Sequence, residues 1–200
     1  MLPLLLSAAL TLSGPHTPAA CVLSDHYRWP MKVDESFRSL TATRVTIGAM
    51  LTSWPIVPLY AGHALPGWCA PRTGNELKTY SVAGWVRAKR MEDDGDWHVE
   101  LTATQTGAVT KCIVVEIPSE DEGAQYTVAR NEFVSRTGIA ENFNGDVAAP
   151  VKIRVMGVAF FDGQHRGAKG TSNPPHGHGR CNSSNRALWE IHPVYSVVAP

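Results

Sequence analysis

The chain has 200 residues, of which 44% are hydrophobic, and it carries 18 basic and 18 acidic side chains. This length and composition fit one domain with a sizeable core and exclude a disordered or collagen-like chain. The formal net charge of zero removes the attraction on which binding to a phosphate backbone normally depends, so composition disfavours a nucleic-acid partner without excluding it.

Residues 1–20 have the pattern of a secretory signal peptide. Leucine and alanine dominate an apolar stretch from Leu4 to Leu12, and small residues lead to Ala20. The stretch is too short to span a bilayer, and the prolines around it disfavour the alternative of a buried helix. We therefore expect an exported protein, periplasmic, envelope-associated or extracellular, with no transmembrane segment in the mature chain. Lipidation of Cys21 is an alternative that would anchor the chain to a membrane.

Four cysteines fit an oxidising compartment and permit two disulfides. They are Cys21, Cys69, Cys112 and Cys181, and the sequence leaves all three pairings open. None has the Cys-x-x-Cys spacing of structural zinc sites or thioredoxin-like proteins. Cys181 lies in a long predicted loop, which we expect it to pin through Cys69 or Cys112.

Residues 21–75 are expected to form an irregular extension that packs on the domain after it. Prolines recur in this segment at positions 30, 55, 58, 66 and 71, and they interrupt regular structure. A short helix over residues 43–52 is one possibility, in which Val45, Ala49 and Leu51 would face a core. Neighbouring threonines have low helix propensity and argue against it.

After residue 75, hydrophobic residues alternate with polar ones at the period of two that is typical of half-buried strands. The predicted strands cover residues 79–90, 97–102, 112–117, 151–161 and 188–198. A helix is predicted over residues 124–137, because Tyr126, Ala129 and Phe133 share one face and Gly138 follows it.

The order of these elements predicts the fold. Three strands, one helix and two further strands give the connectivity of the oligonucleotide/oligosaccharide-binding (OB) barrel. We therefore expect a mainly β (α+β) domain over residues 76–200, built on a five-stranded OB-type barrel with one helix between its third and fourth strands. Closing the sheet also removes exposed edges. The alternative is another small α+β arrangement of the same elements.

Three short clusters pair an imidazole with a carboxylate: Asp96 with His98, Asp162 with His165, and Glu190 with His192. The first cluster follows the connection between the first two strands, and the other two flank the connection between the last two. In OB barrels these connections lie at one pole, where ligands usually bind. Strand parity indicates that the side chains face outward, so we interpret the six residues as a candidate ligand-binding site.

Four of these side chains, Asp162, His165, Glu190 and His192, supply the nitrogen and oxygen ligands that suit zinc or another divalent metal. In the alternative interpretation, the imidazoles cap the strand ends as structural anchors.

The predicted loop over residues 163–186 is long for a compact domain, and such loops are usually functional or disordered. It contains His176 and His178 in a Gly-His repeat, and either histidine could complete a metal site. Repeats of this kind are also common flexible tracts with incidental metal affinity.

Several segments together resemble a family of uncharacterised exported bacterial proteins with an Arg-Trp-x-x-Lys start and a Glu-Leu-His-Pro-Val-type ending. The matching segments are Arg28-Trp29-Pro30-Met31-Lys32, Asp96-Trp97-His98-Val99, Phe160-Phe161-Asp162 with His165, and Trp189-Glu190-Ile191-His192-Pro193-Val194. The resemblance covers most of the chain after residue 20 and implies a shared architecture. The resemblance says little about activity. The long Gly-His loop of this chain departs from the family pattern.

Three functional hypotheses remain, and the first is favoured over enzymatic activity. A binding module would hold a polar ligand, a saccharide or an oligonucleotide, at the barrel pole. A metal-dependent hydrolase, for example a nuclease-like enzyme, would hold its ion on the four metal-ligand candidates, with His98 or Asp96 assisting a bound water. A structural exported protein would use the polar motifs only to close the barrel.

Overall fold

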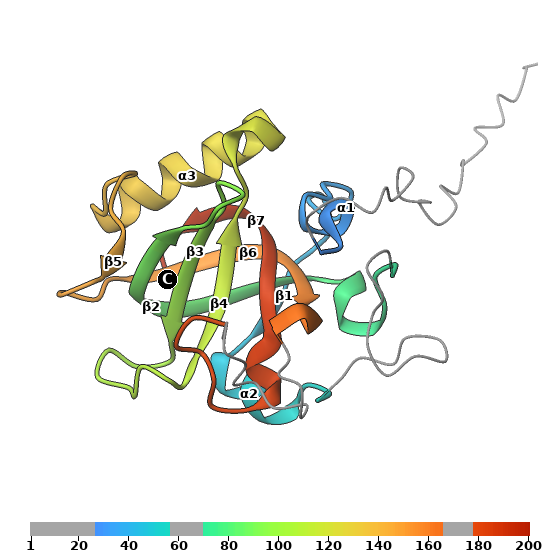
Figure 1. The fold of residues 1–200 in the computed structure, drawn as a ribbon, viewed down its shortest axis with the longest axis horizontal. Coiled ribbons are helices and arrows are strands. Elements are labelled where there is room, and N and C mark those ends of the chain that lie inside the picture. Colours follow the sequence, from blue (N-terminus) through green and yellow to red (C-terminus); the bar gives the residue numbers. More distant parts are fainter. Residues whose placement is uncertain (1–26, 57–69, 166–177) are drawn as a thin grey trace, which may run out of the picture.

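The computed structural model describes residues 27–56, 70–165 and 178–200. The predicted signal peptide, Cys21, Cys69 and His176 lie outside these ranges, so the predictions made for them stay predictions. At the centre of the described chain a sheet curls into a closed barrel, which Figure 1 shows with β3 and β4 beside β7.

Five strands close the barrel. They are β2 (Thr79–Met91), β3 (Trp97–Thr102), β4 (Cys112–Ile117), β6 (Lys152–Phe161) and β7 (Trp189–Val198). Their neighbours run in the order β2, β3, β4, β7, β6, and β6 pairs with β2 to close the ring. The β4–β7 pair is parallel and the other pairs are antiparallel. This is the predicted OB barrel, and the strand predictions are confirmed within a residue or two.

Alternation along the strands fills the barrel and leaves polar side chains outside it. Trp97, Val99 and Leu101 of β3 belong to the main hydrophobic core. His98 and Glu100 alternate with them and therefore lie on the outer face of the sheet. Gly84 of β2 sits where a Cβ atom would lie 2.8 Å from the Ile47 Cδ1 atom, so glycine allows a close approach there.

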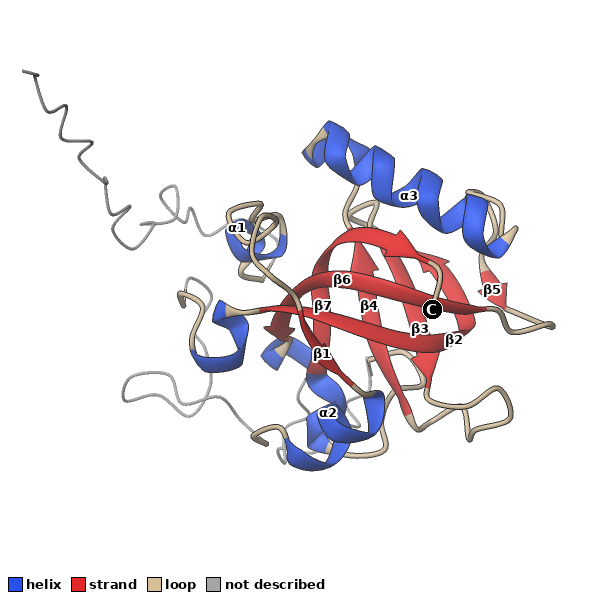
Figure 2. Ribbon diagram, turned by 180° about the vertical axis from the view of Figure 1, so that it is seen from behind, coloured by secondary structure: helices blue, strands red, loops and turns tan. Residues whose placement is uncertain are grey.

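Helix α3 (Ala124–Thr137) connects β4 to β6, as predicted, and lies along one side of the barrel (Figure 2). Tyr126, Ala129 and Phe133 are buried, and the Phe133 ring packs edge-on against Trp97 with 5.8 Å between centroids. Gly138 ends the helix with a φ of 70°, the left-handed conformation that glycine adopts at low cost.

The N-terminal segment adds short elements to the barrel. They are α1 (Trp29–Lys32), β1 (Thr43–Val45), α2 (Ile47–Ser53) and the 3₁₀ turn η1 (Gly74–Leu77). β1 pairs in parallel with β2. The possible helix over residues 43–52 is therefore only partly right, because its first residues form a strand and Thr46 caps a helix that begins at Ile47. The Thr46 hydroxyl accepts a hydrogen bond from the Ala49 N–H at 3.0 Å.

The remaining short elements lie in connections between the barrel strands. They are η2 (Glu120–Glu122), β5 (Gly145–Asp146), which pairs with β2, η3 (Gly163–His165) and η4 (Asn185–Leu188). A disulfide joins Cys112 at the start of β4 to Cys181 in the β6–β7 connection, which is one of the two expected partners. Disulfides persist in oxidising, non-cytoplasmic compartments.

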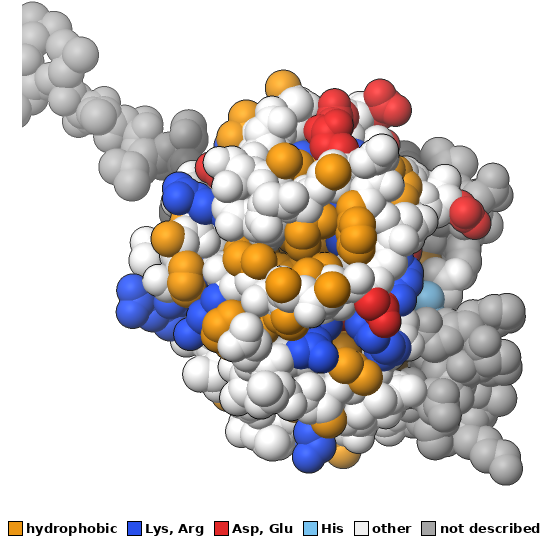
Figure 3. Space-filling view, turned by 90° about the vertical axis from the view of Figure 1, so that its left-hand side faces the viewer, with side chains coloured by type: hydrophobic (Ala, Val, Ile, Leu, Met, Phe, Trp, Pro, Cys, Tyr) orange, Lys and Arg blue, Asp and Glu red, His pale blue; other side chains and the backbone are white. Residues whose placement is uncertain are grey.

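The surface is mixed in character. Figure 3 shows one face on which hydrophobic side chains lie across the middle, with basic side chains mostly below them and acidic side chains mostly above. Within the described ranges, no helix combines the length and apolarity needed to cross a membrane.

Candidate functional site

The structure brings five of the six predicted site residues into one buried polar network, with the sixth at its edge. We define the polar network as Lys32, Asp96, His98, Glu100, Glu116, Asp162, His178, Glu190 and His192, none of which is more than 7% exposed. The His165 side chain, 31% exposed, borders it. The strand residues point out of the barrel, as strand parity predicts, and they are buried on that outer face. Helix α1 and the β6–β7 connection cover them.

Strand register explains why residues far apart in the sequence meet. His98 of β3 lies directly across from Glu116 of β4. In the parallel β4–β7 pair, Val114 is the partner of Glu190, so Glu190 and His192 follow on the same outer face. The residues therefore meet on the outer face of the sheet, along β3, β4 and β7, as well as at the ends of the strands.

His192 lies at the centre of one part of the network. Its Nδ1 atom is 2.8 Å from the Glu116 Oε2 atom and 3.1 Å from the Glu190 Oε1 atom. Its Nε2 atom is 3.2 Å from the Oδ2 atom of Asp96, whose other oxygen accepts a hydrogen bond from the Ser119 N–H at 2.8 Å. The sequence placed His192 with Asp162, His165 and Glu190. Its ion-pair partners are Asp96, Glu116 and Glu190, so the contact with Glu190 is the one that the structure shows.

A second part of the network joins the ends of β6 and β7. The His178 Nε2 atom lies 2.8 Å from the Glu190 Oε2 atom, and its Nδ1 atom lies 2.7 Å from the carbonyl oxygen of Ala187. The Asp162 Oδ2 atom is 3.6 Å from the His165 Nε2 atom. The His165 and His178 rings are 5.3 Å apart. Ligand atoms of Asp162, His178 and Glu190 lie within 4.8 Å of one another, and His165 contacts Asp162, so His178 is found beside Glu190 where His192 was predicted with Asp162 and His165.

Lys32 of α1 links the two parts. Its Nζ atom lies 3.5 Å from the Asp162 Oδ2 atom and 4.0 Å from the Glu116 Oε2 atom. Burial lowers the pKa of this ammonium, but the two carboxylates outweigh burial and raise the pKa above its ordinary value. Lys32 therefore stays charged and holds α1 against the outer face of the barrel.

Three buried imidazoles favour their charged form. Burial disfavours charge on each, but neighbouring carboxylates raise the pKa of His178 and raise the pKa of His98 and His192 well above its usual range. Burial would raise the pKa of Glu116, yet His192 and Lys32 together hold it well below the ordinary value. The network thus holds several opposite charges side by side in a buried region.

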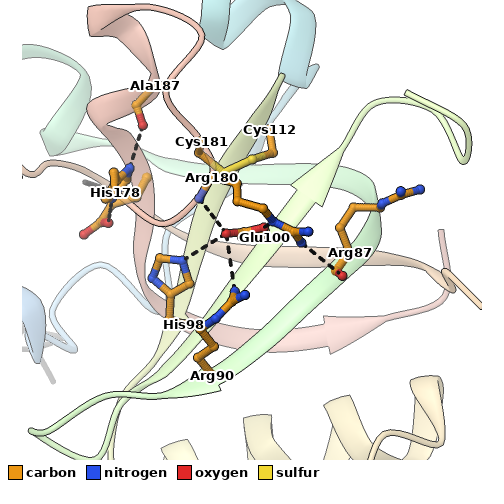
Figure 4. The surroundings of a disulfide bond; sticks show 10 residues. Arg87, Arg90, His98, Glu100, Cys112, His178, Arg180, Cys181 and Ala187 are labelled. Carbon is orange, nitrogen blue, oxygen red and sulfur yellow. Dashed lines mark hydrogen bonds and ion pairs between the residues drawn. A yellow bond between two sulfur atoms is a disulfide. The ribbon is translucent and has the colours of Figure 1, made fainter. Parts of the chain in front are cut away.

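Glu100 ties the β6–β7 connection to β3, as Figure 4 shows. Its carboxylate accepts hydrogen bonds from the backbone N–H and the Nε atom of Arg180, both at 2.8 Å. Gly179 lies against the same carboxylate with a φ of 54°, and a Cβ atom there would come within 2.5 Å of the Glu100 Oε1 atom. Only glycine lets the connection approach this closely.

We expect Glu100 to make stability depend on acid pH. Burial raises the pKa of its carboxyl group, but His98 and Arg180 outweigh this and lower it from 4.5 to about 2. A group with a depressed pKa stabilises the fold above its unfolded value, and this contribution is lost as the pH falls from 4.5 through 2. The size expected is roughly 2 to 3 kcal/mol.

The Glu100→Gln variant should therefore lose that free energy of unfolding at pH 7 and show a flatter profile between pH 5 and pH 2. Urea unfolding at a series of pH values measures both. The matched control is Glu120→Gln, which changes an exposed carboxylate and should keep the wild-type profile. Equal profiles for Glu100→Gln and Glu120→Gln would show that the Arg180 ion pair contributes nothing measurable.

A cleft lies beside the network. It has a volume of about 510 Å³ and is bounded by the β2–β3 turn, by η3 and by the N-terminal segment. The lining residues are Tyr27, Lys32, Arg90, Met91, Glu92, Asp93, Asp94, Gln164 and His165. The two connections that OB barrels use for ligands thus meet here. We call this the polar cleft.

A second groove of about 600 Å³ lies beside α2 and differs in charge. Arg44, Lys152 and Arg154 line it together with small and apolar residues, and none of the lining residues in the described part of the chain is acidic. It contains none of the predicted site residues.

Three members of the network were not predicted as site residues, namely Lys32, Glu100 and Glu116. Glu116 is a lone carboxylate in an otherwise apolar strand, which is an unusual position that could have drawn attention to it. Lys32 was noted only as part of a motif. Lys32 reaches Asp162 and Glu116 from helix α1, and Glu100 pairs with Arg180, so these roles depend on tertiary contacts.

No family model, curated protein or solved structure matches the chain. The resemblance stated above therefore remains a prediction, and the case for function depends on the geometry of the site.

Proposed function

We propose that the protein is a binding module that holds a neutral, hydroxyl-rich ligand of the saccharide class in the polar cleft. The observation that carries this proposal is the position of the cleft between the β2–β3 turn and η3. These belong to the two connections through which OB barrels commonly bind oligomeric ligands.

The charge of the lining favours a saccharide over an oligonucleotide. Three carboxylates line the cleft, Glu92, Asp93 and Asp94, against two cations. Lys32 already pairs with buried carboxylates, and Arg90 pairs with Glu100 at 3.5 Å and with Asp146 at 3.1 Å. A phosphate backbone would therefore meet repulsion, and among the described lining residues both cations are already paired with carboxylates. Sugar hydroxyls can both donate to the carboxylates and accept from Gln164.

We also infer that the protein acts outside the cytoplasm. The Cys112–Cys181 disulfide supports this location, because reducing compartments keep cysteine thiols in the reduced form. The predicted signal peptide at residues 1–20 supports the same location. A polar-ligand site in an exported barrel is consistent with recognition of envelope or extracellular carbohydrate.

The test is a titration of the isotope-labelled protein with two neutral tetrasaccharides, one of glucose and one of N-acetylglucosamine, followed by NMR of the backbone amides. We expect one of them to shift amide signals of residues 90–94 and 164–165. The double variant Asp93→Ala, Gln164→Ala should weaken that binding about tenfold, because it removes two hydrogen-bonding side chains. Both residues are exposed, so the fold should persist.

The control double variant, Gln105→Ala with Asp121→Ala, removes the same two side-chain types at exposed positions outside the cleft. It should bind as the wild type does. Titration with a ten-residue oligothymidylate provides a further arm: shifts at Arg44, Lys152 and Arg154 would assign the partner to the basic groove and overturn the saccharide proposal. Absence of cleft shifts with both sugars at millimolar concentration would overturn it too.

A further inference from the structure

The polar network is rich in carboxylates relative to its fixed cations. Asp96, Glu116, Asp162 and Glu190 are all buried, and the Lys or Arg side chain that forms ion pairs within this group is Lys32. Glu100 is a separate case, because it has Arg180 as its partner. The remaining positive charge comes from protonated imidazoles, and a divalent ion bound beside Glu190 would displace the proton from the His178 Nε2 atom.

We propose that a divalent cation of the zinc class binds Asp162, His165, His178 and Glu190, where the ends of β6 and β7 meet. The proposal does not depend on which ligand occupies the polar cleft. Two imidazole nitrogens and two carboxylate oxygens form a set that zinc accepts, at bond lengths of about 2.0 to 2.2 Å. The set differs from the sequence prediction by one residue, His178 in place of His192.

The distances between the candidate ligand atoms suit a shared ion. The His178 Nε2 and Glu190 Oε2 atoms are 2.8 Å apart, and the Asp162 Oδ2 and His165 Nε2 atoms are 3.6 Å apart. Ligand atoms of Asp162, His178 and Glu190 all lie within 4.8 Å of one another. Ligands of one tetrahedral zinc ion are separated by roughly 3 to 4 Å, so small side-chain movements suffice.

Each buried ligand is oriented by a second contact. The His178 Nδ1 atom donates to the Ala187 carbonyl oxygen at 2.7 Å, which leaves the Nε2 atom to face Glu190 and the ion. The Asp162 Oδ1 atom accepts from the Gln164 N–H at 3.0 Å, so the Oδ2 atom, 3.5 Å from the Lys32 Nζ atom, is the one that faces His165. The Glu190 Oε1 atom is 3.1 Å from His192. Metal-binding imidazoles and carboxylates are usually held in this manner.

The cleft provides the path for the ion, and the ligand count suggests its role. His165 is partly exposed and lines the polar cleft, so an ion can reach Asp162 from solvent. Four protein ligands make a closed site, which is typical of structural rather than catalytic zinc. The ion would fasten η3 and the His178 end of the β6–β7 connection to β7.

Metal affinity tests the proposal directly. Chelator-treated, untagged protein is titrated with Zn²⁺ in competition with a chromophoric chelator, and with Co²⁺ by visible absorption. We expect one ion per chain and the absorption of four-coordinate Co²⁺. His165→Ala should weaken Zn²⁺ binding at least tenfold while circular dichroism stays unchanged, because this side chain is partly exposed. Asp162→Asn should weaken it as well.

The matched control is His176→Ala, which removes the other histidine of the Gly-His repeat and should leave the affinity unchanged. Loss of binding in His176→Ala but not in His165→Ala would assign the metal to the repeat and overturn the proposal. So would wild-type affinity weaker than about 100 μM, which would indicate incidental binding only. Saccharide titration of the chelator-treated protein keeps this result separate from the proposed function, since each can fail alone.

Discussion

Replacing Arg28 with methionine should lower the free energy of unfolding by about 3 to 5 kcal/mol, the usual cost of leaving one partner of a buried ion pair alone. The Arg28 Nη1 and Nη2 atoms donate to the two oxygens of Glu76 at 2.7 and 3.1 Å, and neither side chain is measurably exposed. Glu76 also accepts from the Phe161 N–H at 2.9 Å. The pair thus joins the N-terminal segment and η1 to the end of β6.

Urea unfolding followed by tryptophan fluorescence measures this loss. Arg38→Met is the matched control, because it removes an exposed guanidinium from the same segment and should change stability by less than about 0.5 kcal/mol. The double variant Arg28→Met, Glu76→Gln should recover part of the loss, since the amide keeps an acceptor for Phe161 without a buried charge. A single variant as stable as the control would contradict the structural role of the pair.

The barrel could be predicted from the sequence because its signal is local. Alternation in residues 97–102 and the apolar residues of 112–117 each indicate a strand without information from elsewhere in the chain. The helix at Ala124–Thr137 is similarly marked by its buried face and by Gly138. The order of these elements then limits the topology. Strand β1 was missed because three residues are too few for a periodic pattern, and its pairing with β2 depends on tertiary contacts.

The site could be predicted only in part, because burial is not a local property. Parity placed His98, Glu190 and His192 on the outer face of the sheet, and that face is normally solvated. Residues 28–32 and 178–188 cover it instead, and nothing near His98 in the sequence indicates such a cover. The pairing of His178 with Glu190 likewise depends on how the long β6–β7 connection folds back, which composition rich in glycine and proline does not reveal.

The Cys112–Cys181 disulfide should contribute roughly 2 to 4 kcal/mol to the free energy of unfolding, because it closes a long loop in the unfolded chain. The two residues are 69 positions apart and belong to a buried cluster with Val114 and Ala187. The double variant Cys112→Ala, Cys181→Ala should show this loss in urea unfolding. It should also exchange the amide hydrogens of residues 178–182 faster, because the bond holds this segment over Glu100.

Two comparisons separate the bond from the packing around it. Adding a thiol reductant to the wild type should reproduce the loss of stability seen in the double variant, while reductant should not destabilise the variant any further through this pair. Faster exchange in residues 178–182 without change in α3 would confirm that the disulfide acts on the cover of the polar network. If the variant unfolds at the wild-type urea concentration, Arg180 and Gly179 alone hold the cover against β3. The polar network would then stay closed under reducing conditions as well, because the contacts between Glu100 and Arg180 do not depend on sulfur.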